Sequence, residues 1–230
     1  MSQQANNIKN ILSIIDDKNK IRIELPISKE TQTLKRYDII SLTNLSDIFS
    51  SENTEEILIN YIGFLIDIIQ TRCTDDLNYI DFLHSIYALR EAENSTFEEL
   101  KLNKILNDIK IKESDLIKND THKFKNNDIS YEVTYKIPTL SRLKDIHSKC
   151  EPSTKDIIFY NTFKFIDKVD ISIKDSTTEV SLAEDLKQLY NVISYKALDE
   201  IGSTPSDITD KLYNLYKVNI ETDTRFLFSI

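Results

Sequence analysis

The sequence predicts an α+β fold that is predominantly helical, with a small antiparallel β element in the middle of the chain. Before residue 100 and after residue 139, apolar residues recur at the three- and four-residue spacing of helices. Between these regions, residues 129–137 alternate apolar and polar side chains, a pattern typical of a half-buried strand. The 230 residues are 40% hydrophobic, which is enough for a core. We therefore expect three segments, residues 1–100, 101–138 and 139–230.

The first segment is expected to begin with a strand. Residues 20–25 alternate with period two, and Pro26 ends the pattern because proline cannot donate to a strand ladder. Residues 34–49 then carry apolar side chains in helical patches, which Thr43 and Asn44 interrupt.

Two stronger helical patterns follow. Thr54 is a good N-cap for a helix that continues to about residue 72. Residues 57–69 of this helix are apolar on most sides, which predicts burial, but they fall short of the ~20 residues that a membrane span requires. After a polar break at residues 75–78, residues 79–91 form a helix with one packed face.

The middle segment is expected to be β-rich. Residues 101–128 contain short alternating pieces, which we interpret as strands joined by exposed turns. The best hairpin signal pairs residues 122–125 with residues 129–137 around the turn at 126–128. Pro138 ends the second of these strands.

The last segment is expected to be mainly helical. Thr139 or Ser141 starts a helix that continues to about Cys150. Residues 157–166 are rich in aromatic side chains and fit either a helix or a strand. We favour a helix because one face stays apolar.

A longer helix is predicted over residues 180–201, with Val192 on its apolar side and Gly202 as its C-cap. Residues 204–206, which include a proline, are expected to turn the chain. Residues 208–215 then add a short helix.

The scarcity of glycine excludes several classes of enzyme. Gly63 and Gly202 are the only glycines, whereas average usage would supply roughly 16. Dinucleotide fingerprints, Walker loops and nucleophile elbows need several glycines, because the backbone must approach a ligand or turn sharply. We therefore expect a non-enzymatic protein without a cofactor.

Charge and cysteine content predict the compartment and exclude some partners. The formal net charge of −9 disfavours nonspecific attraction to nucleic acid or to anionic membranes. Cys73 and Cys150 are too few for a disulfide scaffold, and free thiols in a reducing cytosol are the simpler interpretation. These features predict a soluble cytoplasmic protein.

Histidine and cysteine offer few candidates for metal binding or catalysis. His147 and Cys150 lie three residues apart, so a metal site or a Cys/His dyad on one helix face stays open. Free cysteine is more commonly a small buried hydrophobe, and His84 is more commonly a histidine at the edge of a core than a base. We predict no metal site.

Seven lysines of the middle segment lie near aromatic residues and could form a nucleic-acid face. Interleaved acids cancel most of their charge, so we prefer a solvated sheet face. The lysines are Lys101, Lys104, Lys110, Lys112, Lys118, Lys123 and Lys125, with Phe124 and Tyr131 nearby.

One family resemblance arises from residues 81–95, which follow an early strand that ends in Glu-Leu-Pro. Asp81 and Phe82 begin a helix rich in Leu and Ile, and Leu89 and Arg90 close it. In this order the segment resembles the N-terminal half of T4-type bacteriophage baseplate hub assembly proteins. Here the closing serine is displaced to Ser95, and Thr96 stands where the family often has glycine.

A second part of the resemblance is residues 133–138, which are similar to the strand and proline that open the family's C-terminal half. Some members carry a C-terminal cysteine-rich metal ribbon. This chain has no cysteine after Cys150, so that metal role is not carried over.

The resemblance implies a protein-binding component, structural or chaperone-like, that acts in tail baseplate hub assembly. Its partners would be hub subunits, and its location the host cytoplasm or the virion baseplate. The implied partner-binding residues are Asp81, Phe82, Ile86 and Arg90. Their structural alternative is that Phe82 and Ile86 belong to the core while Arg90 pairs with Asp81 or caps the helix. The alternative function is a small cytosolic enzyme or a nucleic-acid-associated protein.

Overall fold

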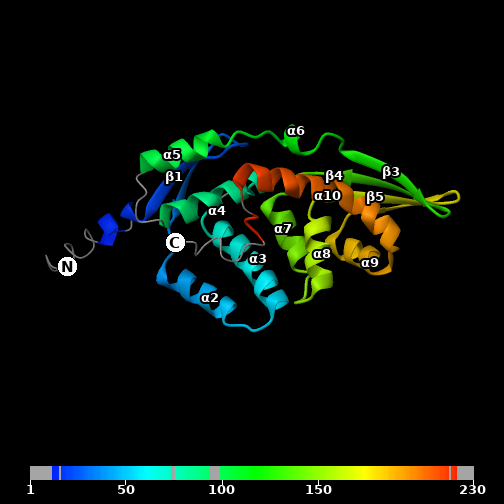
Figure 1. Cartoon of the computed structure of the whole chain (residues 1–230), viewed down its shortest axis with the longest axis horizontal. Helices are drawn as coiled ribbons and strands as arrows, with labels where there is room; N and C mark the ends of the chain where they lie inside the picture. Colours follow the sequence, from blue (N-terminus) through cyan, green and yellow to red (C-terminus); the bar gives the residue numbers. More distant parts are fainter. Residues whose placement is uncertain (1–11, 16, 74–75, 94–98, 218, 222–230) are drawn as a thin grey trace, which may run out of the picture.

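A computed structural model describes residues 12–15, 17–73, 76–93, 99–217 and 219–221. The molecule is elongated, with helices along most of its length and a four-stranded sheet that extends to one end (Figure 1). The structure confirms the predicted class, since it is α+β, mostly helical, and its sheets are antiparallel.

The strands described form two sheets. A small sheet has the order β1-β2, and a larger one the order β3-β4-β5-β6. The strands are β1 (Lys20–Glu24), β2 (Thr31–Lys35), β3 (Thr121–Asn126), β4 (Ile129–Tyr135), β5 (Ile166–Ile173) and β6 (Ser176–Val180).

Helices cover the space between and beside the sheets. They are α2 (Ile39–Phe49), α3 (Thr54–Gln70), α4 (Tyr79–Glu93), α5 (Glu99–Asp108), α6 (Glu113–Leu116), α7 (Leu140–His147), α8 (Thr154–Phe163), α9 (Ala183–Val192) and α10 (Tyr195–Tyr216). None of the helices in the described residues combines the length and hydropathy that crossing a membrane would need.

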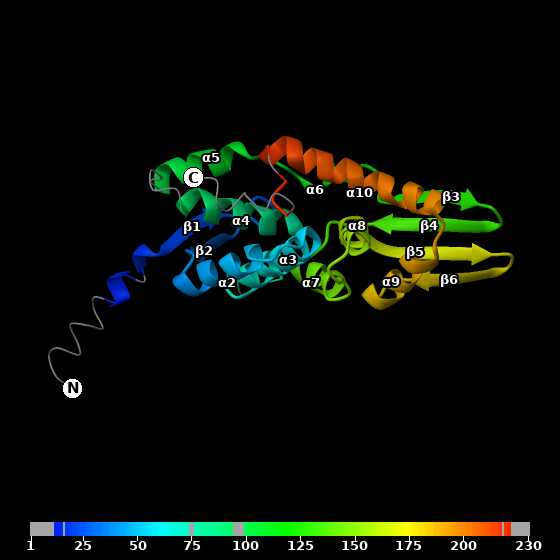
Figure 2. The same ribbon diagram turned by 60° about the horizontal axis from the view of Figure 1, so that its bottom comes forward.

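The larger sheet confirms the predicted hairpin and adds two strands. β3 and β4 pair antiparallel around a turn in which Asn127 has a φ of 55°. This left-handed conformation suits asparagine. β5 and β6 were not expected, although Val169, Ile171 and Ile173 alternate with polar residues along β5. The sheet therefore crosses the segment boundary that we placed at residue 138 (Figure 2).

The two faces of this sheet differ sharply. Along β4, Tyr131, Val133 and Tyr135 are buried, and they share their face with Val169 of β5. The opposite face carries polar side chains, including Lys123 and its ion-pair partner Glu132 at 2.8 Å. α10 contacts the sheet along β3, and α9 contacts it along β6. The sheet thus packs one side on helices and leaves the other hydrated.

One hydrophobic core extends over nearly the whole described chain, from Ile21 to Ile220. α3 lies in its centre, with Tyr61, Ile62 and Leu65 fully buried, as its apolar sequence predicts. The helix predicted within residues 157–166 is also confirmed by α8. The helix ends at Phe163, however, and Ile166, the last residue of the predicted range, already begins β5.

Two predictions for the first and middle segments are wrong. Residues 31–35 form β2, where we expected helix from residue 34, and the helix there begins only at residue 39. Residues 99–108 form α5 instead of strands, because Leu102 and Leu106, four residues apart, both reach the core.

The prediction of one helix over residues 180–201 that ends at Gly202 is also wrong. Val180 ends β6, and the chain then forms α9 and the 22-residue α10, which continues through Pro205. Proline cannot donate to the carbonyl four residues earlier, that of Ile201. The hydroxyl of Tyr135 donates to this carbonyl at 3.0 Å, so the unpaired group is satisfied from β4 and the helix persists.

Candidate functional site

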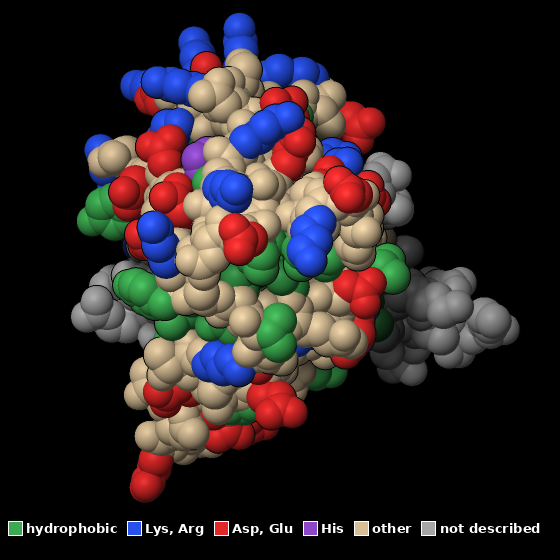
Figure 3. Space-filling view, turned by 90° about the vertical axis from the view of Figure 1, so that its right-hand side faces the viewer, with side chains coloured by type: hydrophobic (Ala, Val, Ile, Leu, Met, Phe, Trp, Pro, Cys, Tyr) green, Lys and Arg blue, Asp and Glu red, His purple; other side chains and the backbone are tan. Residues whose placement is uncertain are grey.

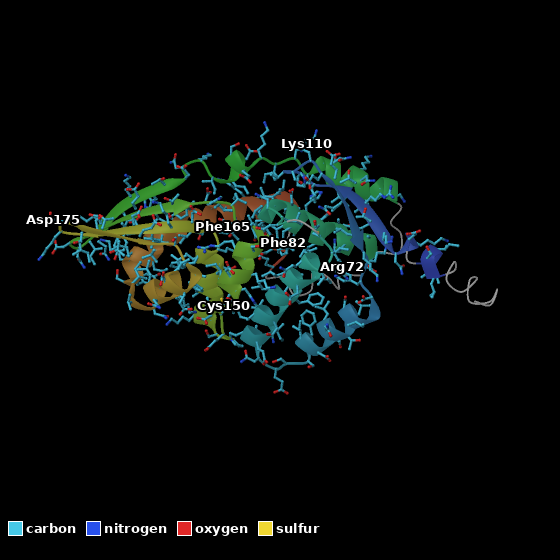
Figure 4. The ribbon with its side chains drawn as sticks, turned by 180° about the vertical axis from the view of Figure 1, so that it is seen from behind. Arg72, Phe82, Lys110, Cys150, Phe165 and Asp175 are labelled. Carbon is cyan, nitrogen blue, oxygen red and sulfur yellow. The ribbon has the colours of Figure 1, made fainter. Side chains whose placement is uncertain are left out.

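The residues predicted to bind a partner lie on α4, in the interior. Asp81, Phe82 and Ile86 are almost fully buried, whereas Arg90 is partly exposed and donates to Glu91. Figure 4 shows Phe82 inside the body of the molecule. A partner would reach the three buried side chains only if α4 moved, so their role in binding stays a prediction.

Asp81 has a clear local task in the folded chain. Its carboxylate accepts hydrogen bonds from the backbone N–H groups of Ile27, at 2.8 Å, and Ser28, at 3.0 Å. The carboxylate thereby fixes the turn that follows β1 against the start of α4. A charged acceptor shared by two backbone donors is a strong interaction in a buried place.

The Cys/His candidate does not have the geometry of a nucleophile and its base. The Cys150 thiol donates to the backbone carbonyls of Ile146 and Asp156, and burial raises the pKa of Cys150 to about 12. The ring of His147 lies 2.9 Å from the Ile59 carbonyl oxygen through Nε2. A thiol with so high a pKa is protonated at neutral pH and is a poor nucleophile.

His147 instead has a packing role against one of the two glycines. A Cβ atom on Gly63 would lie 2.8 Å from Cε1 of His147. The absent side chain of Gly63 therefore lets α7 approach α3 closely. No group of three or more His, Cys, Asp or Glu side chains in the described ranges could hold a metal ion.

The basic and aromatic residues of the β3–β4 hairpin face opposite sides of the sheet. Lys123 and Lys125 alternate with Phe124, which stacks on Tyr131 at 4.9 Å between ring centroids. A nucleic-acid strand that stacked on these rings would not meet the two ammonium groups on the same face. The arrangement favours the solvated face that we preferred from the sequence.

A buried ion pair joins the end of α8 to the segment after α10. Lys164 and Glu221 have side chains that are only 3% exposed and bind each other directly. Glu221 also accepts from the hydroxyl groups of Tyr160, at 2.7 Å, and Tyr79. Burial lowers the pKa of Lys164 and raises the pKa values of both tyrosines.

This cluster has no room for a substrate. The ammonium of Lys164 lies between the rings of Tyr79, Tyr160 and Phe165, at 4.8 to 5.2 Å from their centroids. The adjoining cavity has a volume of about 20 Å³, which is enough for a water molecule and little more. The lysine thus ties the segment at residues 219–221 to the core. Sequence reasoning missed it because its partner is 57 residues away along the chain.

Exposed apolar side chains gather at the sheet end of the molecule. Val192 and Tyr195 are 80% and 84% exposed, and Ile173 is about half exposed. Partly buried Ile129, which pairs with Ile173 in the sheet, and Ile171 extend the patch. We call these five residues the end surface. Figure 3 shows hydrophobic side chains in a band across this end, below a group of charged side chains.

The end surface forms where three parts of the chain meet. The side-chain amide of Asn126 donates to the hydroxyl of Ser194 at 2.5 Å, which ties the start of α10 to the end of β3. Val192 ends α9 two residues earlier. The sequence pattern placed Val192 on a buried helix face, but the break between α9 and α10 turns it to solvent.

A second group of exposed apolar residues lies at the opposite end of the molecule. Leu12, Ile14 and Ile15 are each at least half exposed, on a helical stretch before β1. Figures 1 and 2 show this stretch beyond the edge of the small sheet. Exposed apolar groups therefore occur at both ends.

Comparison with known proteins gives no relative. No family model, no curated protein and no solved structure matches the chain. The resemblance to baseplate hub assembly proteins therefore stays a prediction from the sequence.

Proposed function

We propose that this protein is a non-catalytic, protein-binding component that acts in the assembly of a larger particle. The observation that carries the proposal is the end surface. Val192 and Tyr195 are apolar or aromatic side chains that are 80% and 84% exposed and lie three residues apart in the chain. Contiguous exposed apolar groups on a soluble domain mark interaction sites, and tyrosine is a frequent anchor of protein interfaces.

The position of the apolar groups supports an assembly role. A component with one apolar group at each end can contact two neighbours at once, which is what holding subunits in a fixed arrangement needs. The partner at the end surface would present an apolar side chain to the space between the sheet and the α9–α10 connection. In line with the sequence resemblance, we propose that baseplate hub subunits are these partners.

The test uses the full chain as bait in cells of its native source. The wild type, the double variant Val192→Asp with Tyr195→Glu, and a control Thr177→Glu would be purified by affinity, and stoichiometric partners identified by mass spectrometry. Thr177 is exposed on the polar face of the same sheet, so the control adds a charge without touching the end surface.

Hub subunits should accompany the wild type and the control in stoichiometric amounts. The double variant should bind them roughly 30-fold more weakly, because charges replace a central aromatic anchor. Recovery of no stoichiometric protein by the wild type, together with DNA binding at physiological salt, would overturn the proposal. If the double variant recovers the hub subunits as well as the wild type does, the end surface is not the binding site.

A further inference from the structure

A cleft of about 560 Å³ lies between the turn after β1 and the segment that joins α5 to α6. This volume falls in the range of sites for small molecules. Apolar side chains cover both walls, and His84 of α4 lines the cleft between them. The apolar lining residues are Leu25, Pro26, Ile27, Leu106, Ile109 and Ile111.

Hydrogen bonds hold both walls in place without a ligand. On the β1 side, Asp81 fixes the turn through Ile27 and Ser28, and the N–H of Leu25 donates to the Glu30 carbonyl at 2.9 Å. On the other side, the N–H of Lys112 donates to the Asp115 carboxylate at 2.9 Å. A cleft with walls fixed in this way is pre-organised for binding.

His84 is the unusual group of this cleft. Its side chain is 1% exposed, and its Nδ1 atom has no hydrogen-bond partner. Burial lowers the pKa of His84 to about 4, so the imidazole is neutral at pH 7. Buried polar atoms nearly always have a partner, and an exception calls for an explanation. Because Nδ1 is enclosed, a polar group of a ligand would supply the missing hydrogen bond once the imidazole ring turns toward the cleft that it lines.

The mouth of the cleft offers ammonium groups that can bind an anion. Lys29, Lys110 and Lys112 line it, and the structure pairs none of their ammonium groups with a carboxylate of the described residues. Figure 4 shows Lys110 directed outward from the segment above α4.

Three acids also line the cleft, and two of them already serve the walls. Glu113 accepts from the side-chain amide of Asn78, and Asp115 accepts from the N–H of Lys112. Glu24 is exposed. Each acid also contributes a carboxylate to the lining, so the lysines offer single ammonium donors at the mouth rather than a net positive charge.

We propose that this cleft binds a small amphipathic carboxylic acid that also carries a hydroxyl or amide group. The apolar body lies between Ile27 and Ile111, the carboxylate lies among the lysines at the mouth, and the second polar group bonds to Nδ1 of His84. The site uses elements other than those of the end surface, so it is independent of the proposed protein binding.

Three probes with the same apolar body separate the parts of this proposal. The full chain would be titrated calorimetrically with 8-hydroxyoctanoate, octanoate and octylammonium. We expect 8-hydroxyoctanoate to bind about tenfold more tightly than octanoate, since its hydroxyl pairs with a buried acceptor or donor. Octylammonium should bind at least roughly fivefold more weakly than octanoate, because it loses an ion pair.

Variants assign these differences to residues. His84→Leu should abolish the advantage of 8-hydroxyoctanoate over octanoate. Lys110→Met with Lys112→Met should weaken the binding of both carboxylates by roughly fivefold. The control Lys125→Met, on the exposed sheet face, should change neither affinity. Should His84→Leu not fold, the ring nitrogen signals of His84 in the wild type provide the readout. They should shift with 8-hydroxyoctanoate and move much less with octanoate.

Several results would overturn the proposal. It fails if 8-hydroxyoctanoate does not bind at concentrations up to about 1 mM, the weak end of specific binding. It also fails if octylammonium binds as tightly as octanoate, or if the His84 signals respond equally to the two carboxylates.

Discussion

Two buried polar sites involve residues of α4, Tyr79 in one and His84 in the other, and they differ in one respect. Around Lys164 and Glu221, ammonium, carboxylate and the hydroxyl groups of Tyr79 and Tyr160 bind one another. At His84, the Nδ1 atom is equally buried and has no partner. The first place is complete and stabilises the fold, whereas the second leaves one polar atom without a hydrogen bond, which is why we propose a ligand for it. Burial of a polar group alone therefore does not indicate function; at His84 the missing partner coincides with a cleft, and that combination supports the proposal.

The largest expected effect breaks the complete cluster. Glu221→Gln removes the counter-charge of Lys164 and should lower the free energy of unfolding by about 3 to 5 kcal/mol, since it leaves a buried ammonium without a carboxylate. Urea denaturation measures the change.

The matched control for Glu221 is Glu184→Gln. Glu184 pairs with Lys149 at 3.0 Å on the surface, and its loss should leave the free energy of unfolding nearly unchanged. A double variant, Lys164→Met with Glu221→Leu, should recover much of the stability that Glu221→Gln loses. If Glu221→Gln lowers the free energy of unfolding no more than Glu184→Gln does, the cluster does not hold the segment after α10 in the way we describe.

The second effect is a pH dependence that comes from His84. Its pKa is about 4 in the folded chain and 6.5 as its ordinary value, so the unfolded chain binds more protons between these values. Stability should therefore fall as the pH drops from 6.5 to 4, by about 3 kcal/mol in total from this group. Urea denaturation from pH 7 to pH 4 measures the slope.

His84→Leu should remove this part of the slope. His122→Leu is the control, because His122 is partly exposed and close to Glu200 at 3.2 Å. If the slopes of the wild type and His84→Leu coincide while both proteins stay folded, the imidazole of His84 is not held neutral by burial.

A third effect concerns the Ile201 carbonyl, which Pro205 leaves without a backbone donor and which Tyr135 satisfies. Tyr135→Phe removes the donor to the Ile201 carbonyl and leaves that acceptor buried, which should cost about 1 to 3 kcal/mol by thermal or urea denaturation. Tyr213 lies in α10, like Ile201, but is half exposed. Tyr213→Phe should therefore change the free energy of unfolding by less than about 0.5 kcal/mol. Equal stability of the two variants would mean that the carbonyl finds another partner.

The smallest effect on stability is expected at the end surface. Tyr195→Glu should change the free energy of unfolding by no more than about 0.5 kcal/mol, because the side chain is 84% exposed. A loss above about 2 kcal/mol in urea denaturation would show that Tyr195 serves the fold, and its exposure would then no longer support a binding role.

The sequence predicted well those elements whose patterns are long and regular. The apolar run of α3, the alternation of β1 and β4, and the hairpin turn near Asn127 are local signals with local causes. One error fell where a distant contact decides the outcome. α10 continues through Pro205 because Tyr135, 66 residues away in sequence from Ile201, satisfies the freed carbonyl.

The surroundings of individual polar and apolar side chains were harder to predict, for the same reason. Asp81 and His84 lie on a helix that the sequence identified, but the pattern does not reveal that one has two donors and the other has none at Nδ1. Exposure of Val192 likewise depends on where α9 ends.

By itself, the sequence determined the fold class and the absence of glycine-rich phosphate-binding loops, because periodicity and residue type act within a few neighbouring positions. Tertiary structure alone decided which buried polar groups have hydrogen-bond partners and which apolar side chains stay exposed. Those outcomes depend on contacts between residues far apart in the chain, such as Lys164 and Glu221. The spacing of residues along the sequence does not predict such contacts.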